Sequence, residues 1–322
     1  MPDTLTTNMR ALRFDSHGEW SEVLHLVDAP VPAPGANQIR IKVHACALNP
    51  MDWVLCLGLM PGPLPGGIGL DVSGTVEAVG EEVTNVKVGD SVFGVPDYLG
   101  FPTAGVAESA VLSVWEPVPA GLDMLSAATL PMAVETATRS LDLLGVSSGQ
   151  TVVVNGGGTM VGFAAVQIAL ARGARVIATA GKTFEKELRG FGAEVTPYGE
   201  GLVESVRGIA GGKVDRVLQT ALSPGQLQDF IKIVDGQPKH VMSITDFDDE
   251  GLGIKTTGRE EDLVPRYDAL SSYAQLAAEG RFVIPVARTF SLDQWREALE
   301  LCHSGHAHGK LLILPASGMC RS

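Results

Sequence analysis

The sequence predicts an α/β protein with two domains, one rich in β-strands and one built on a doubly wound parallel sheet. Up to about residue 120, short segments alternate apolar and polar residues and show almost no helical periodicity. From Thr151 onward, strand-like and helix-like segments alternate, as in a parallel sheet with crossover helices. At the start of that region, a β-branched run leads through consecutive glycines into an apolar helical segment.

The N-terminal segments alternate in the way that half-buried strands require. Ile39, Ile41 and Val43 are separated by polar or charged residues, so one face of this strand is expected to be exposed to solvent. Glycines and prolines, such as those at 30–35, mark the turns between segments. The predicted strands cover residues 11–14, 23–27, 38–45, 71–80 and 90–93.

Helical spacing begins near Ser126, and strands and helices then alternate to about residue 244. Strands are expected at 151–154, 174–180, 214–220 and 240–244, and helices at 161–172, 182–191, 202–210 and 226–234. A helix at 267–279, a helix capped by Ser291 and Gln294 in S-x-x-Q form, and a strand at 311–314 follow. The expected domains are residues 1–125 with 265–322, and residues 126–264.

The segment from Thr151 to Gly173 has the order strand, glycine turn, helix. Such a turn directs free backbone N–H groups and the positive end of a helix dipole at one point, where a pyrophosphate can bind. Gly162 lies one residue later than in a strict G-x-G-x-x-G pattern and lets the helix pack close to the strand. The alternative is a tight turn without a ligand. The expected cofactor-binding residues are Gly156, Gly157, Gly158, Thr159, Met160 and Val161.

The end of the next predicted strand bears on the choice between NAD and NADP. An Asp or Glu there would hold the adenosine ribose of NAD. The sequence instead has Thr179, Ala180, Gly181 and Lys182, so a 2′-phosphate would meet a lysine and hydroxyl groups. NADPH or NADP is therefore the expected cofactor, with Thr179, Gly181 and Lys182 in its site. The alternative is that Lys182 is a solvated residue that opens a helix.

Composition restricts the function further. The 322 residues are 45% apolar, enough for a large core. A formal net charge of −13 argues against nucleic acid or an anionic membrane surface as the main partner. The four cysteines have no paired spacing, so neither a disulfide framework nor a cysteine zinc site is expected. Without a signal-peptide pattern or a long apolar stretch, the chain is expected to be cytoplasmic.

Several motifs occur in the order found in one known family. Residues 45–52 (ACALNPMD) are similar to A-x-x-x-N-P-x-D, and residues 69–76, 79–80 and 88–92 to G-x-D-x-x-G-x-V…VG…GD-x-V. Residues 127–131 resemble the family's entry helix and residues 309–312 (GKLL) its closing strand. Over nearly its whole length the chain thus resembles the medium-chain dehydrogenase/reductase superfamily, in its zinc-free quinone oxidoreductase-like (zeta-crystallin-like) branch.

This resemblance implies a GroES-like catalytic domain interrupted by a Rossmann domain, with the active site in the cleft between them. In the zinc-dependent branch the catalytic metal takes ligands at positions matched here by Asn49, Leu70 and Met132. Leucine cannot bind Zn²⁺ and methionine binds it poorly, so no metal is expected. The family often dimerises through the edge of the Rossmann sheet, and a homodimer is therefore expected.

The resemblance also suggests roles for residues of the catalytic domain. Asn49 is expected to donate to a substrate carbonyl or to hold the nicotinamide ribose, and the alternative is that it caps the turn before Pro50. Asp52 is assigned to the catalytic group, although a structural role toward backbone N–H groups is the alternative for Asp52 and the expected role for Asp71. Tyr98 is the candidate proton donor.

Further cofactor contacts are assigned on both sides of the glycine turn. Thr136 resembles a residue near the nicotinamide carboxamide, and Tyr198 one that packs by the 2′-phosphate together with Lys182. Thr220 and Lys310 are also assigned to the cofactor site.

The chain departs from the family where a quinone would bind. It has Val54, Cys56 and Met60 where many quinone reductases have Tyr, Arg and Tyr. With Trp53, Leu57, Leu59 and residues 95–101, these side chains suggest an apolar pocket, or alternatively they pack on the core.

Three functional hypotheses follow. The first is an NADPH-dependent oxidoreductase that transfers hydride to a quinone or an α,β-unsaturated carbonyl compound. The second is an enoyl reductase of a biosynthetic pathway, with an acyl chain in the apolar pocket. The third is a nucleotide-binding protein that keeps the fold without turnover, because fold does not fix function.

Overall fold

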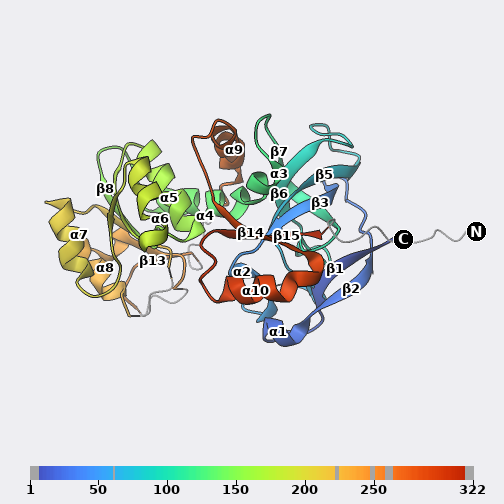
Figure 1. Cartoon of the computed structure of the whole chain (residues 1–322), viewed down its shortest axis with the longest axis horizontal. Coiled ribbons are helices and arrows are strands. Elements are labelled where there is room, and N and C mark those ends of the chain that lie inside the picture. Colours follow the sequence, from blue (N-terminus) through green and yellow to red (C-terminus); the bar gives the residue numbers. More distant parts are fainter. Residues whose placement is uncertain (1–6, 61, 222–224, 247–250, 258–263, 316–322) are drawn as a thin grey trace, which may run out of the picture. The chain divides into compact units, whose positions relative to one another are not determined.

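The computed structural model describes residues 7–60, 62–221, 225–246, 251–257 and 264–315. The chain forms two compact units (Figure 1). Unit 1 consists of Met1–Met132 and Leu270–Ser322, and unit 2 consists of Ala133–Ala269. Each unit has its own apolar core. In chain order, the first part of unit 1 is followed by the whole of unit 2, and the C-terminal segment completes unit 1.

Unit 1 is built around a six-stranded sheet with the order β14-β15-β3-β5-β6-β7. An additional pairing of β3 with β7 closes four of these strands on themselves. The strands are β3 (Ile39–Ala47), β5 (Asp71–Val79), β6 (Ser91–Pro96), β7 (Ser109–Pro117), β14 (Val286–Ser291) and β15 (Lys310–Leu314). Because β3 is antiparallel to both β5 and β15, the end of β3 meets the starts of these two strands. Polar residues at those three chain ends are thereby brought together.

A second sheet and several helices complete unit 1. The three-stranded sheet has the order β2-β1-β4, from β1 (Asn8–Phe14), β2 (Leu24–Pro30) and β4 (Gly66–Gly67). The helices are α1 (Trp20–Val23), α2 (Met51–Cys56), α3 (Met124–Ala128), α9 (Leu270–Ala278) and α10 (Trp295–His303). Helix α10 lies beside β14 and β15 (Figure 1). The apolar core combines residues of β1, β3, β5, β15 and α10, so the two chain segments of unit 1 share one core.

Unit 2 contains a six-stranded parallel sheet with the order β10-β9-β8-β11-β12-β13. The strands are β8 (Thr151–Asn155), β9 (Arg175–Thr179), β10 (Glu194–Thr196), β11 (Arg216–Gln219), β12 (Val241–Ser243) and β13 (Lys255–Thr256). In chain order within the unit this is 3-2-1-4-5-6, the order of a Rossmann fold. The strand order reverses between β8 and β11, which is where ligands bind in open parallel sheets.

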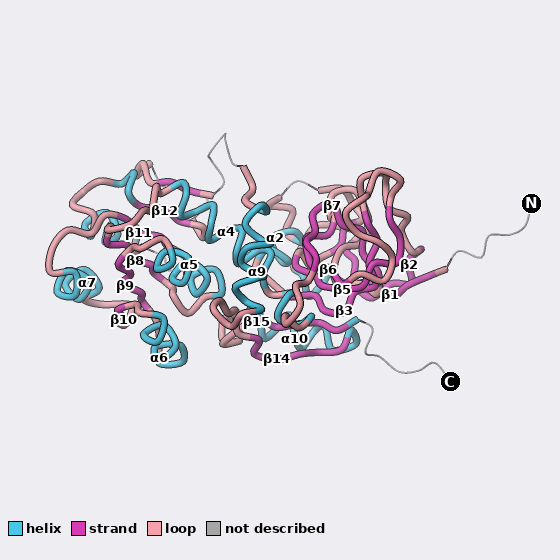
Figure 2. Tube along the Cα trace, turned by 90° about the horizontal axis from the view of Figure 1, so that it is seen from above, coloured by secondary structure: helices cyan, strands magenta, loops and turns pink. Residues whose placement is uncertain are grey.

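Helices cover both faces of this sheet. Figure 2 shows α5 (Met160–Ala171) and α6 (Lys182–Phe191) on one side of the strands and α7 (Leu202–Ala210) on the other. Helix α8 (Leu227–Ile233) packs beside α7 in the core of the second face. Strand β8 is buried along almost its whole length because both faces are covered, which explains its unbroken run of valines. Helix α4 (Leu130–Leu143) begins in unit 1 and continues into unit 2.

The predicted α/β class is confirmed, but two details of the prediction were wrong. The N-terminal region was expected to have almost no helix, yet it contains α1 and α2. These helices have four and six residues, and less than two helical turns cannot display an apolar period. The predicted capping box of Ser291 and Gln294 is present, but it begins a short 3₁₀ turn (Leu292–Gln294) ahead of α10.

Among the residues that the structure describes, no helix combines the length and the apolar character needed to cross a membrane.

Candidate active site

The glycine turn of unit 2 connects β8 to α5 at the reversal of strand order. Gly156 has φ of +86°, a conformation that side chains disfavour, and a Cβ there would be 2.6 Å from the Cβ of Ala221. A Cβ on Gly162 would be 2.1 Å from the carbonyl oxygen of Gly156. Glycine at these two positions therefore lets the helix approach the strand end, and the predicted strand, turn and helix are confirmed.

Thr159 caps the helix and ties the turn to the neighbouring strand. Its hydroxyl oxygen accepts from the N–H of Gly162 at 3.1 Å, and the hydroxyl lies 3.0 Å from that of Thr220, just after β11. Thr220 Oγ1 also lies 2.9 Å from the carbonyl oxygen of Asn155 and 3.0 Å from that of Gly156. Thr220 is buried, and its hydrogen bonds hold the turn against the end of β11.

Thr179 holds the other side of the turn. Its hydroxyl donates to Asn155 Oδ1 at 2.7 Å and accepts from the N–H of Gly156 at 2.9 Å. The amide of Asn155 in turn donates to Gln219 Oε1 at 2.6 Å. Thr179 is fully buried and its hydroxyl is engaged in both directions. Its side chain therefore shapes the turn, whereas a direct cofactor contact was expected from the sequence.

Three backbone N–H groups of the turn are left for a ligand. Within the described part of the chain, the N–H groups of Gly158, Met160 and Val161 have no hydrogen-bond partner. Met160 and Val161 form the first turn of a 12-residue helix, whose dipole is positive at this end. All three residues are partly exposed, so these donors face a place that an anion can reach. The residues present thus fit a pyrophosphate.

The end of β9 brings together Gly181, Lys182 and Tyr198. Strand β10 pairs with β9, and the chain after β10 returns past Gly181. A Cβ on Gly181 would lie 3.9 Å from the hydroxyl oxygen of Tyr198, whose side chain is 66% exposed. Lys182 is exposed at the start of α6. The carboxylate nearest in sequence, Glu185, is paired with Arg189 at 3.0 Å.

Thr136 lies on α4 beside a buried ion pair. Glu135 Oε1 accepts from Arg139 Nε at 2.6 Å, and Arg139 also donates to Thr257 Oγ1 at 2.9 Å. The hydroxyl of Thr136 donates to Glu135 Oε2 at 3.1 Å, and Thr136 is partly exposed. This network fixes the surroundings of Thr136. It was not predicted from the sequence.

Unit 1 contains a buried polar cluster of Asn49, Asp71 and Lys310, where β3, β5 and β15 meet. Lys310 Nζ donates to Asn49 Oδ1 at 2.5 Å and to Asp71 Oδ2 at 2.9 Å, while Asn49 Nδ2 donates to the same Asp71 oxygen at 2.9 Å. Lys310 can only donate and Asp71 only accepts when ionised, so these partners fix which way the Asn49 amide points. The second oxygen of Asp71 accepts from the N–H of Met132 at 2.7 Å.

Asp52 lies beside this cluster on α2 and is fully buried. Its two carboxylate oxygens accept from the backbone N–H groups of Asn49 and Gly69, each at 2.7 Å. Burial raises the pKa of Asp52 to about 7, although these two hydrogen bonds favour the charged form. Asp52 therefore holds the segment around Asn49 through backbone N–H groups, which is the structural role that the sequence left open as the alternative.

Tyr98 is half-buried and packs against the core of unit 1. Burial raises the pKa of its hydroxyl, and the charge of Asp97 adds to this effect. The phenol therefore stays protonated well beyond neutral pH. It keeps a proton that can be donated.

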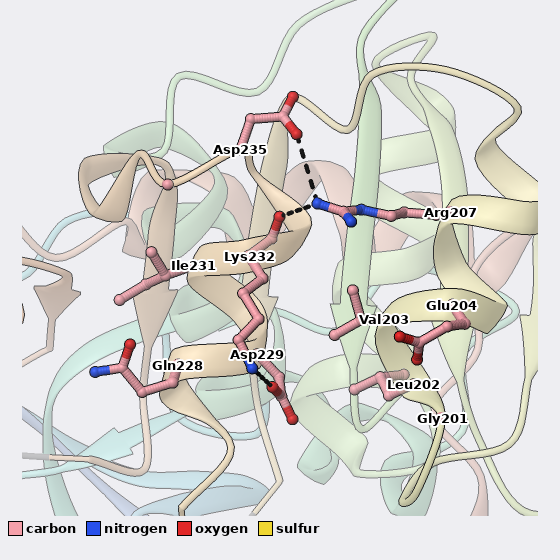
Figure 3. A pocket seen from close by; sticks show the side chains of 11 residues that line it. Gly201, Leu202, Val203, Glu204, Arg207, Gln228, Asp229, Ile231, Lys232 and Asp235 are labelled. Atoms are coloured by element: carbon pink, nitrogen blue, oxygen red, sulfur yellow. Dashed lines mark hydrogen bonds and ion pairs between the residues drawn. The ribbon is translucent and has the colours of Figure 1, made fainter.

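A separate pocket of about 450 Å³ lies between α7 and α8 (Figure 3). Four of its charged side chains form ion pairs, Lys232 with Asp229 at 2.7 Å and Arg207 with Asp235 at 3.7 Å. Arg207 also donates to the carbonyl oxygen of Lys232 at 2.8 Å. None of the residues predicted as site residues lines this pocket. It lies on the face of the sheet that α7 and α8 cover, away from α5, and is not part of the candidate site.

The family resemblance matched Asn49, Leu70 and Met132 to the positions of the catalytic zinc ligands in the zinc-dependent branch. Leu70 is a buried member of the apolar core, and Met132 packs against that core. Across the described residues, no three His, Cys, Asp or Glu side chains are grouped as a metal site requires.

Comparison with known proteins agrees with this architecture. Residues 35–115 match the family model described as alcohol dehydrogenase GroES-like domain, and residues 191–313 the model described as zinc-binding dehydrogenase. A quinone oxidoreductase of pig (Sus scrofa) is 31% identical over 326 residues, covering 95% of this chain and 98% of the relative. A 2-methylene-furan-3-one reductase of tomato (Solanum lycopersicum) is 29% identical, covering 97% of this chain and 80% of the relative.

A solved structure shares the fold throughout. The structure of the quinone oxidoreductase from Coxiella burnetii matches with a TM-score of 0.80 at 29% identity, covering 96% of this chain and 100% of that chain. Together with the two sheets, these findings define a member of the medium-chain dehydrogenase/reductase superfamily. Within it the chain belongs to the quinone oxidoreductase-like branch and is an oxidoreductase. Membership implies a nicotinamide cofactor.

The structure brings the predicted residues together in two places. In unit 2, Thr159 and Thr220 lie at the glycine turn, and Gly181, Lys182 and Tyr198 lie at the end of β9. In unit 1, Lys310 joins Asn49, although the sequence gave no indication that they pair. The central acceptor of this cluster, Asp71, was expected only to bind backbone N–H groups. A lysine and an aspartate at the starts of the two strands that flank β3 could have suggested the pair once the strand order was known.

The close approach at Gly162 leads to a stability prediction. We expect Gly162→Ala to lower the free energy of unfolding by about 1–3 kcal/mol, because the new Cβ meets a backbone oxygen that cannot move away. Gly158→Ala is the matched control, since the nearest atom to its Cβ is Phe184 Cδ2 at 3.6 Å, an ordinary contact. Urea unfolding of both variants provides the measurement. Equal effects of the two substitutions would contradict the close-approach argument.

The raised pKa of Asp52 leads to a pH prediction. Since the folded chain holds this proton more tightly than the unfolded chain, whose pKa is near 3.8, the stabilising contribution is complete below about pH 4 and is lost as the pH rises through 7. We expect Asp52→Asn to remove this part of the decline. Urea midpoints at pH 5 and pH 8 measure it, with the exposed Asp28→Asn as control. An identical decline in the wild type and Asp52→Asn would refute the assignment.

Proposed function

We propose that this protein is a zinc-independent, NADPH-dependent reductase of conjugated carbonyl compounds, either quinones or α,β-unsaturated ketones. The observation that carries the proposal is the glycine turn with three unpartnered N–H groups, next to a strand end that has Lys182 in place of a carboxylate. The similarity to a quinone oxidoreductase and to a furanone reductase supports the class of acceptor.

The turn residues would hold the pyrophosphate, and the end of β9 would hold the adenosine end. Gly158, Met160 and Val161 offer N–H donors. The hydroxyl oxygen of Tyr198 lies 3.9 Å from the Cβ position of Gly181, the residue before Lys182, and we assign the 2′-phosphate to this strand end. The ammonium group of Lys182 favours a phosphate at that position. For NAD, the protein lacks there the carboxylate that usually accepts from the 2′-hydroxyl of the ribose. When bound, the nicotinamide supplies the hydride.

The cluster of unit 1 would act on the substrate through position and charge, because Asn49 Nδ2 itself donates to Asp71 and to the carbonyl oxygen of Ala47. Lys310 and Asp71 hold the amide of Asn49 in one orientation, and Asp52 holds the backbone on which Asn49 lies. We assign Asp52 and Asp71 as positioning residues, because their oxygens are engaged. A rigid, largely dry polar group of this kind stabilises developing charge better than mobile water does.

Proton transfer is assigned to Tyr98. Its phenol is protonated at neutral pH, and it belongs to the apolar segment that was expected to line the substrate pocket. Zinc independence is supported by residue identity, since the buried Leu70 has no atom that can bind the metal.

Replacing Lys182 tests the cofactor choice. We expect the wild type to bind NADPH at least about tenfold more tightly than NADH, and Lys182→Ala to remove about 1.4 kcal/mol of that preference. Titration followed by tryptophan fluorescence gives both affinities. Lys186→Ala, an exposed lysine one turn further along α6, is the matched control and is expected to have little effect. Equal affinity for the two cofactors in the wild type would overturn the NADPH assignment.

Replacing Tyr98 tests the proton donor. Tyr98→Phe keeps the packing of the ring and removes only the hydroxyl, so kcat for enone reduction should fall by about 10² while NADPH affinity is unchanged. The variant Tyr273→Phe removes a hydroxyl from α9 of the same unit and serves as control. The measurement is NADPH oxidation with a panel of quinones and unsaturated ketones. An unchanged kcat in Tyr98→Phe would assign the proton to solvent.

A further inference from the structure

Two neighbouring segments of unit 1 expose leucine side chains. Leu59 is 69% exposed, and Leu57, Leu64 and Leu99 are exposed as well. The two segments lie side by side, because a Cβ on Gly62 would be 3.8 Å from Leu99 Cδ2. These four side chains are named the leucine surface. Leucines exposed in such a group mark a binding surface, whereas single exposed leucines need no explanation.

The segment that carries three of the four leucines contains no charged side chain. From Trp53 to Leu70 the sequence has no charged side chain, although charged residues make up 19% of the chain. Asp97, next to the second segment, accepts from Gln38 Nε2 at 2.7 Å and from the N–H of Gly100 at 2.9 Å, so its charge is bound within its own loop. A phosphorylated or otherwise anionic carrier would find no lysine or arginine between Trp53 and Leu70.

The leucine surface continues from the polar cluster through a single short helix. Asn49 lies just before α2, and Leu57 is the residue that caps its other end. A helix of six residues is about 9 Å long. Trp53, within the helix, and Met60, three residues beyond Leu57, are partly buried and pack against the apolar core. A molecule whose carbonyl group lies near Asn49 can therefore extend an apolar chain toward the leucines.

We propose that the leucine surface binds an uncharged aliphatic tail of the substrate, so that the enzyme prefers conjugated ketones or quinones with long tails. This proposal rests on the reductase function above and names its substrate class. Each methylene that leaves water for such a surface strengthens binding by up to about fourfold. A net charge of −13 does not favour an anionic membrane as the occupant.

The experiment compares alkyl vinyl ketones whose tails lengthen from methyl to octyl, as NADPH-dependent acceptors. Calorimetric binding of the matching saturated methyl ketones is measured beside it. We expect kcat/KM and affinity to rise with each added methylene in the wild type. The rise should be largely lost in Leu59→Gln and Leu99→Gln, and NADPH affinity is measured to check that both variants are folded. Val88→Gln, another exposed apolar residue of unit 1, should retain the full rise.

The outcomes separate this inference from the proposed function. Turnover that does not depend on tail length overturns the tail site and leaves the reductase function standing. Binding that rises with tail length, without turnover of any acceptor, supports the tail site and overturns the reductase function. If the leucine variants instead change co-sedimentation with neutral lipid vesicles or self-association, and the dependence on tail length persists, the surface serves another partner and the inference is wrong.

Discussion

The ion pair between Lys310 and Asp71 is the interaction on which the organisation of unit 1 depends. Both side chains are almost completely buried, and an ammonium or a carboxylate alone in such a place would cost several kcal/mol. The charges are tolerated because each has further partners: Lys310 donates to Asn49, and Asp71 accepts from Asn49 and from the N–H of Met132. The pair joins the last strand of the chain to a strand formed 239 residues earlier. The C-terminal segment is therefore required for an intact site.

The glycine turn of unit 2 follows a different physical rule. Here the main constraint is steric, because α5 approaches the end of β8 so closely that the carbonyl of Gly156 occupies the place of a side chain on Gly162. Met160 and Val161 begin the helix, where N–H groups have no intrahelical acceptor, and no other described residue accepts from them. Thr179 and Thr220 hold the turn from the two neighbouring strands. Pre-organised donors of this kind bind an anion without having to rearrange first.

The function proposed above divides the chemical work between the units. In that proposal the backbone donors and Lys182 of unit 2 bind the nucleotide, while the polar cluster and the uncharged, leucine-rich segment of unit 1 bind the substrate. A substrate suited to unit 1 has one polar reacting group and an apolar remainder. Conjugated ketones and quinones fit that description, and the relatives named for quinones and for a furanone are consistent with it.

The sequence by itself determined the features that depend on local chemistry. Alternating apolar residues predicted the sheets, and three glycines after a valine run predicted the turn, because both follow from residue type and spacing. The argument against a zinc ligand at Leu70 also needed the resemblance to the family, which identified the position. Helices as short as α2 escaped prediction, since one and a half turns show no period.

Only the tertiary structure decided which distant residues meet. Asn49 and Lys310 are 261 residues apart, and they meet because β3 lies between β5 and β15. The tertiary structure also showed that the hydroxyl of Thr179 binds Asn155, beside the turn. It showed that Asp52 holds the backbone beside Asn49, and that burial raises the pKa of Asp52. Strand order and burial are properties of the whole fold, and short segments of sequence do not contain them.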